Sequence, residues 1–293
     1  MRHSYFFFLV LLTIACSDPK PETLFKDVAG ESGVEFTNEL VFDKDFNIFT
    51  YRNFYNGGGV GIGDVNNDGL PDIYFTGNQV KNKLYLNKGD LKFEDITQQA
   101  GVAGDRAWST GVSMIDINGD GFLDIYVCNS GDIDGDNKQN ELFINNGDLT
   151  FSEQAEKYNL ADNGFSTHAA FLDYDKDGDL DLYLLNNSYA AIGSFNLMKN
   201  IRPVRDSVGG DKLFRNDANS FVDVSEEAGI YGSIIGFGLG ITIGDVNDDG
   251  WQDIFITNDF FEKDNLYVNN QDGTFTESLE NSMRSISAAS MGA

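Results

Sequence analysis

The sequence predicts an all-β protein: a β-propeller of four-stranded antiparallel blades, with about four blades in 293 residues. Three observations favour this fold class. A nine-residue aspartate motif occurs four times, beginning at residues 64, 116, 173 and 245. Each copy lies between a glycine-rich run and strand-like runs, and 24 Phe and 12 Tyr supply large side chains for a core between repeated sheets. An acidic β-sandwich with aspartates in surface loops is the alternative.

The charge balance restricts the possible partners. The chain has 20 Lys and Arg against 47 Asp and Glu, a formal net charge of −27. This charge repels phosphate and anionic lipid headgroups, so we expect no nucleic-acid partner and no attraction to a membrane surface. Two histidines and two cysteines are too few for a His/Cys zinc site or a disulfide framework.

The N-terminal residues are organised as an export signal. Arg2 and His3 precede an apolar run that is too short to span a bilayer as a helix. Ala15 and Cys16 resemble a bacterial lipoprotein signal, which implies a signal peptide at residues 1–15, lipidation of Cys16 and a tether at 16–23. Because Asp does not directly follow Cys16, the enterobacterial sorting rule implies an exported outer-membrane lipoprotein of the cell envelope, anchored only by its lipid. Plain secretory cleavage is the alternative.

Each repeat contains four predicted strands. Small residues suit an innermost strand, because inner strands converge on the propeller axis. The expected first strands are 57–63, 109–115, 166–172 and 236–244. Apolar runs predict second strands at 73–75, 125–127, 182–184 and 254–256. Third strands are expected at 84–87, 142–145, 213–216 and 266–269. After turn residues, the fourth strands carry Phe93, Phe151, Phe221 and Phe275.

The aspartate motif reads Asp-x-Asn/Asp-x-Asp-Gly-x-x-Asp and predicts a calcium site. Positions 1, 3, 5 and 9 offer side-chain oxygens, position 7 a backbone carbonyl, and Gly at position 6 allows the sharp turn around a hard cation. One such motif can be a solvated turn, but four in register favour about four Ca²⁺ sites. The expected ligands are Asp64, Asn66, Asp68, Leu70, Asp72, Asp116, Asn118, Asp120, Phe122, Asp124, Asp173, Asp175, Asp177, Asp179, Asp181, Asp245, Asn247, Asp249, Trp251 and Asp253.

An EF-hand is the competing interpretation of these loops. It requires a bidentate acid at position 12, on a following helix. The residues at that position are Phe75, Val127, Leu184 and Ile256. Apolar strand residues there indicate β-hairpin loops, so calcium sensing by helix opening is not expected.

The repeats resemble the FG-GAP/VCBS repeats of integrin-α-type propellers over residues 24–293. A second signature, Phe-x-Asp-x-x-x-x-x-Gly-Val/Ile, begins at Phe25, Phe93 and Phe221 and resembles the ASPIC/UnbV, cartilage-acidic-protein-like branch. The resemblance implies a calcium-stabilised scaffold for adhesion or ligand binding, part of a seven-bladed ring. We therefore expect the chain to be truncated inside its next blade, with residues 25–34 as the tail of another blade.

Strand order predicts where ligands bind. The loops between strands 1 and 2, which carry the predicted calcium sites, are expected on the same face as the loops between strands 3 and 4. The insertions at 130–139 and 188–210 lie between strands 2 and 3, on the opposite face, which is therefore the better candidate for a binding surface. The longer insertion carries a candidate binding loop with Phe195, Lys199, Arg202 and Arg205; a loop folded onto its own acidic surface is equally open. The shorter insertion, with Asp132, imitates the metal spacing, so a fifth metal also stays open. We interpret His168 and Cys128 as packing residues.

Three functional classes remain. The first is a non-catalytic scaffold that binds a protein or a glycan, favoured because no nucleophile, base and orienting group come together in any repeat. The second is a carbohydrate-binding or polysaccharide-utilisation accessory protein, which exposed aromatic residues on the insertion face would favour. The third is a hydrolase or lyase whose catalytic part is missing from this chain.

Overall fold

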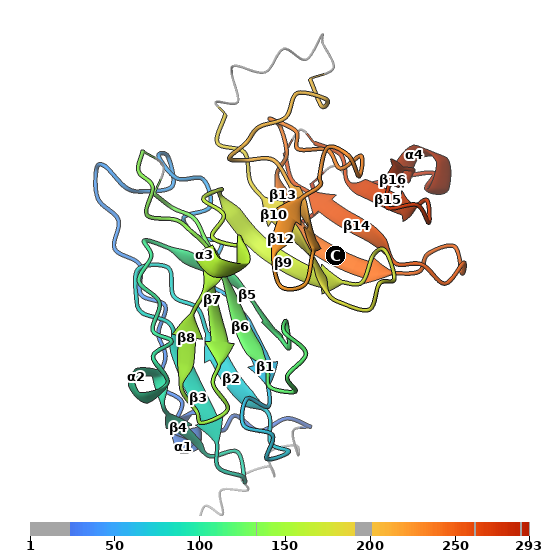
Figure 1. The fold of residues 1–293 in the computed structure, drawn as a ribbon. Helices are drawn as coiled ribbons and strands as arrows, with labels where there is room; N and C mark the ends of the chain where they lie inside the picture. The colour runs from blue at the N-terminus through green and yellow to red at the C-terminus, as the bar shows by residue number, and fades with distance from the viewer. Residues whose placement is uncertain (1–23, 133, 191–200, 261, 288, 293) are drawn as a thin grey trace, which may run out of the picture.

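The computed structural model describes residues 24–132, 134–190, 201–260, 262–287 and 289–292. The strands of these residues form four sheets, each of four antiparallel strands in chain order (Figure 1). This arrangement confirms the predicted all-β fold built from repeated four-stranded blades. Cys16 and the rest of the leader lie outside the described residues.

The strand bounds follow the predicted pattern closely. The first blade contains β1 (Val60–Gly63), β2 (Asp72–Phe75), β3 (Lys83–Asn87) and β4 (Phe93–Asp95). The second contains β5 (Ser109–Ile115), β6 (Asp124–Asn129), β7 (Glu141–Asn145) and β8 (Phe151–Glu153). The third contains β9 (Ser166–Leu172), β10 (Asp181–Asn186), β11 (Lys212–Asn216) and β12 (Phe221–Asp223). The fourth contains β13 (Gly238–Gly244), β14 (Asp253–Asn258), β15 (Asn265–Asn269) and β16 (Phe275–Glu277).

The first strands of successive blades lie side by side, as inner strands of a propeller do. Hydroxyl groups connect them: Thr110 Oγ1 in β5 donates to the Ser166 carbonyl (2.8 Å), and Thr167 Oγ1 in β9 donates to the Gly238 carbonyl (3.1 Å). The approach is close enough to require glycine, because a Cβ on Gly111 would lie 2.5 Å from the Thr167 carbonyl oxygen. The small residues of the predicted first strands therefore have a steric cause.

The hydrophobic core lies between the blades. Tyr74 and Ile125 belong to the cluster between blades one and two, and Tyr126 and Leu182 belong to the cluster between blades two and three. A third cluster, which includes Tyr183, fills the space between blades three and four. Burying a side chain of leucine size contributes roughly 1.5–3 kcal/mol. These layers therefore hold the sheets together, with aromatic residues of the outer strands as large components.

A short helical turn follows the fourth strand in most blades, which the sequence did not predict. These helices are α2 (Thr97–Ala100), α3 (Ala155–Tyr158) and α4 (Leu279–Ser282), and a similar turn, α1 (Ala29–Ser32), precedes the first blade. The Asp of the Phe-x-Asp signature explains the turn after blade one. Asp95 accepts hydrogen bonds from the Thr97 N–H and hydroxyl (3.1 and 2.6 Å), and the Thr97 hydroxyl oxygen accepts the N–H of Leu84 (2.9 Å). The signature thus fastens the turn to the third strand.

The segment containing α1 packs against blade one as α2 packs against blade two. A Cβ on Gly33, after α1, would lie 2.6 Å from the carbonyl oxygen of Phe93, and one on Gly101, after α2, would lie 3.8 Å from that of Phe151. This is the packing expected of the tail of a preceding blade.

The chain between α1 and β1 crosses to the face that carries the 2–3 loops, which we call the insertion face. Arg52 donates from Nη2 to the Ser188 carbonyl (2.7 Å), and its guanidinium lies over the ring of Phe237. Tyr51 stacks on Tyr189 and meets Trp108 edge-on. With the hydrogen bond from Asn38 to Asn78 of blade one (2.6 Å), residues 35–57 therefore contact all four described blades. The opposite face carries the aspartate loops, and we call it the aspartate-loop face.

Candidate functional site

The four aspartate loops share one backbone conformation. Glycine at position 6 is left-handed in each loop, with φ between 86° and 97° at Gly69, Gly121, Gly178 and Gly250. Position 4 is also left-handed, at Asn67, Gly119, Lys176 and Asp248. The predicted sharp turn is therefore present, and a second one, which the sequence analysis missed, precedes it.

In the first, second and fourth loops, the position-1 carboxylate is bound by the loop's own backbone. Asp64 accepts the N–H groups of Asp68 and Gly69 (3.1 and 2.7 Å), and Asp116 and Asp245 accept the equivalent groups. The side-chain oxygen at position 3 accepts the N–H of position 5; for example, Asn66 Oδ1 accepts the N–H of Asp68 (3.2 Å). The position-5 carboxylate accepts the N–H of position 7, at Leu70, Phe122 and Trp251.

The position-9 aspartates lie deeper than the other predicted ligands and connect two strands. Asp72, Asp124, Asp181 and Asp253 are at most 1% exposed. Asp124 accepts the N–H of Ile117 (3.1 Å) in its own loop and that of Asn145 (2.8 Å) at the end of β7. The other three carboxylates make the equivalent pair of bonds. We call this arrangement the aspartate latch; the sequence analysis treated these residues only as ligands.

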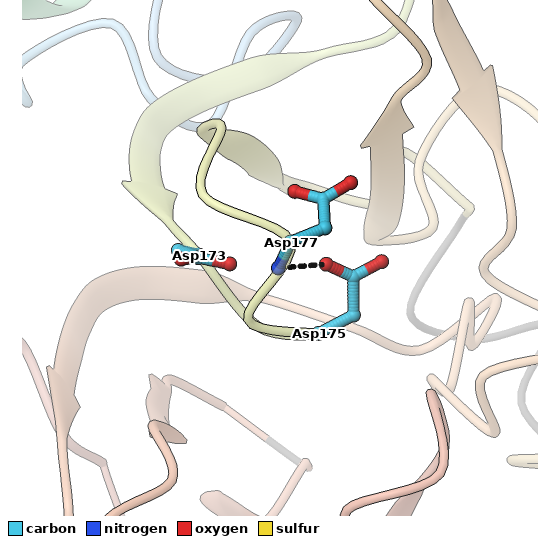
Figure 2. A group of neighbouring side chains, drawn as sticks. All are labelled: Asp173, Asp175 and Asp177. Atoms are coloured by element: carbon cyan, nitrogen blue, oxygen red, sulfur yellow. Dashed lines mark hydrogen bonds between the residues drawn. The ribbon is translucent and has the colours of Figure 1, made fainter.

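The third loop differs from the others. One oxygen each of Asp173, Asp175 and Asp177 lies within 4.8 Å of the others, as Figure 2 shows. Asp177 donates its N–H to Asp175 (3.3 Å), whereas Asp173 Oδ1 is buried with no hydrogen-bond partner among the described residues. Ligands of one calcium ion at 2.3–2.6 Å lie at most about 5 Å apart. The spacing and the unpaired oxygen therefore fit a calcium ion.

Burial and like charge raise the pKa of several loop carboxyls. Removal from water raises the pKa of Asp181 to about 7 and of Asp124 to about 6, and nearby aspartates add to the rise. The same causes raise the pKa of Asp179 to about 6, although its side chain is less deeply placed. A cation bound beside these groups would stabilise their ionised forms.

Residues 64–127 and 130–184 match a family described as FG-GAP-like repeat. Over these two ranges the chain is similar to FG-GAP-like repeats. The first match contains two complete aspartate loops and the second contains one, and each match ends in the second strand of a blade.

Relatives and one solved structure extend this finding. Cartilage acidic protein 1 of Xenopus tropicalis is 32% identical over 142 residues, which are 47% of this chain and 21% of that protein. The human protein of the same name is 26% identical over 178 residues, 60% of this chain and 24% of the relative. The chain therefore spans less than a quarter of these relatives. An Agrocybe aegerita lectin, described as recognising non-reducing terminal N-acetylglucosamine, aligns at 18% identity and a TM-score of 0.39, covering 73% of this chain and 49% of the lectin.

The candidate binding loop is only partly described. Phe195 and Lys199 lie outside the described residues. Arg202 forms an ion pair from Nε to Glu262 (2.6 Å), and Arg205 donates to the carbonyls of Ile230 and Asp211 (both 3.0 Å). These two arginines are therefore engaged by the protein itself, as in a loop folded onto its own acidic surface.

The predicted packing residues lie inside the fold. Cys128 is buried in β6 with a free thiol. His168 is half-buried in β9, and burial lowers the pKa of its imidazole. In the shorter insertion, Asp132 accepts the N–H of Asn137 (3.1 Å), and the ammonium of Lys138 donates to the Gly135 carbonyl (2.7 Å). The ammonium group of Lys138 therefore already places a positive charge in this loop.

A second latch, absent from the sequence analysis, closes each 2–3 hairpin on the insertion face. A side-chain oxygen just before the third strand accepts the backbone N–H at the end of the second strand. The acceptors are Asn82, Asn140, Asp211 and Asp264. Sequence comparison of the four repeats shows an Asn or Asp at this place, so a repeat alignment could have found it.

No described helix has the length and apolar character needed to cross a membrane.

Proposed function

We propose that this chain is a non-catalytic, calcium-stabilised β-propeller scaffold of the cell envelope, which binds a protein or a glycan. The observation that carries the proposal is the third aspartate loop, where three carboxylates converge and one buried oxygen lacks a partner. The same loop conformation in the other blades supports about four Ca²⁺ sites. Carboxylate, amide and carbonyl oxygens are the ligands that calcium prefers.

Calcium would act on stability in this proposal. Each loop joins the first strand to the second, and its position-9 aspartate also contacts the third strand. An ion at positions 1, 3 and 5 would remove the repulsion between carboxylates at the edge of each blade. With a dissociation constant of 0.1 to 1 mM, typical in order of magnitude of extracellular modules, the sites would fill outside the cell.

We further propose that the chain has no catalytic role. His168, the histidine outside the leader, has no hydrogen bond to a carboxylate or hydroxyl among the described residues, so its surroundings do not support a base.

We also propose that the protein is held at the envelope by a lipid on Cys16. Labelled palmitate should enter the protein and be lost in Cys16→Ala. Unlabelled wild-type protein would refute the anchor.

Thermal unfolding in EDTA and then in increasing Ca²⁺ tests the metal sites. The midpoint should rise with calcium, and each filled site should add about 1.4 kcal/mol at ten times its dissociation constant. Asp68→Ala, Asp120→Ala, Asp177→Ala and Asp249→Ala should each reduce the rise. Asp45→Ala removes the same charge from an exposed residue outside the loops and should leave the calcium response unchanged. No response at millimolar calcium would overturn the metal sites.

A further inference from the structure

A pocket of about 430 Å³ opens on the insertion face, where the inner strands of the blades begin. Thr110 and Gly111 at the start of β5 and Thr167 and His168 at the start of β9 form its base. Its wall includes Asn53 and Tyr55, from the segment that crosses this face, together with the apolar residues Trp108, Leu239 and Met291. The volume lies in the range of small-molecule sites.

The lining of this axial pocket is neutral. None of the residues that line it is Asp, Glu, Lys or Arg, although the chain carries a net charge of −27. Burial lowers the pKa of His168, which keeps the imidazole uncharged at neutral pH. An anion would find no positive partner there and would be repelled by the whole protein, and a simple cation would find no carboxylate.

The lining is also partly polar, which disfavours a purely apolar ligand. Asn53 is 8% exposed, and its Nδ2 has no hydrogen-bond acceptor among the described residues. This amide group is therefore not fully used by the fold. An apolar ligand would exclude water and leave such groups unpaired, at a cost in affinity.

An aromatic ring stands at the mouth of the pocket. Tyr55 is 62% exposed, although its neighbour Phe54 is fully buried and meets it edge-on (5.0 Å between ring centres). A side chain this exposed on an ordered wall offers an apolar face together with a hydroxyl group. The pocket thus combines an aromatic face with uncharged amide, hydroxyl and imidazole groups. This combination suits a ligand whose ring has apolar C–H groups on its faces and hydroxyl groups at its edge.

We propose that the axial pocket binds one neutral sugar residue of a glycan. The inference rests on the proposed scaffold function and gives it a ligand class and a position. Tyr55 stacks on the sugar ring, and Asn53, Asn56 and His168 are placed to exchange hydrogen bonds with its hydroxyl groups. Because the segment that carries Asn53 and Tyr55 is not repeated, the chain has one such site and not one per blade.

Isothermal titration of the full chain in millimolar calcium tests this proposal, with a panel of neutral monosaccharides followed by a glycan array. At least one neutral sugar should bind at one site per chain. Tyr55→Ala should weaken binding about tenfold, the equivalent of one lost contact of about 1.4 kcal/mol. Phe49→Ala is the matched control, because Phe49 is 94% exposed in the same segment and does not line the pocket. Asn53→Ala should weaken binding as well.

The outcomes separate this inference from the scaffold function. If no neutral sugar binds to protein that calcium still stabilises, the proposed sugar site is wrong and the proposed scaffold function is unaffected. Sugar binding that survives both Tyr55→Ala and Asn53→Ala, or four equivalent sites per chain, would place the ligand elsewhere and overturn it too. Binding of choline without any sugar would show an aromatic cation site instead. If Asn53→Ala fails to fold, Tyr55→Ala decides, because its exposed side chain can be removed without leaving a cavity.

Discussion

The two faces of the blades differ in how strictly they repeat. On the aspartate-loop face, every blade presents a nine-residue loop with the same left-handed positions and the same buried aspartate. On the insertion face, the connection between the second and third strands changes from blade to blade, and residues 35–57 cover part of it. Repetition therefore serves the stability of each blade, whereas the non-repeated segment supplies part of the wall of the axial pocket.

The largest expected effect comes from the aspartate latch. Asp124→Ala leaves the buried N–H groups of Ile117 and Asn145 without acceptors, and each such group costs about 1–3 kcal/mol. Asp120→Ala, in the same loop but exposed, should cost far less in EDTA and lose mainly the calcium response. Unfolding free energies of both variants, with and without calcium, measure the difference. Equal losses in EDTA would contradict a structural role for position 9.

Two glycines distinguish steric packing from backbone strain. Gly111→Ala places a Cβ 2.5 Å from a backbone oxygen of the neighbouring inner strand, so blades two and three must separate. Gly178→Ala meets no atom within 4 Å but forces alanine to φ near 97°, a strain of about 1–2 kcal/mol. We expect Gly111→Ala to lower the melting temperature more and to abolish sugar binding. A smaller loss for Gly111→Ala would contradict the close packing of the inner strands.

The smallest effect should appear at the insertion-face latch and depend on pH. Burial raises the pKa of Asp211 to about 7, with Tyr183, Arg205 and Glu262 nearby. The folded protein therefore disfavours the ionised form, and stability is lost as pH rises from about 4, the unfolded value, to 7. Asp211→Asn keeps the acceptor oxygen and copies Asn140 of blade two.

Asp211→Asn should accordingly match wild type near pH 4 and exceed it modestly above pH 7, in melting temperatures measured in EDTA at both pH values. Asp264→Asn, at the same place in blade four, provides a comparison in a second blade. A loss of stability in Asp211→Asn above pH 7 would show that the ionised carboxylate is required.

The sequence predicted the repeated part of this fold and missed what does not repeat. The four strands of each blade and the turn at Gly69 and its equivalents follow from local patterns, because small inner residues and aspartate spacing are visible in any single repeat. Asn53 and Tyr55 could not be placed, because their position depends on long-range contacts such as Arg52 with Ser188. The third loop did carry a sequence signal, because position 3 is Asp175 there and Asn in the other three loops. The unpaired oxygen of Asp173 was not visible in the sequence, since it depends on the hydrogen bonds of the folded loop.

The hydroxyl groups between inner strands, at Thr110 and Thr167, donate to backbone carbonyls of the next blade. A carbonyl is present whatever side chain the neighbour carries, so this joint does not require the two blades to change together. A blade copied, lost or exchanged within such a chain would meet the same acceptors at its new position. These hydrogen bonds between inner strands thus permit the number and order of the blades to vary during evolution, because each new neighbour offers the same backbone acceptors.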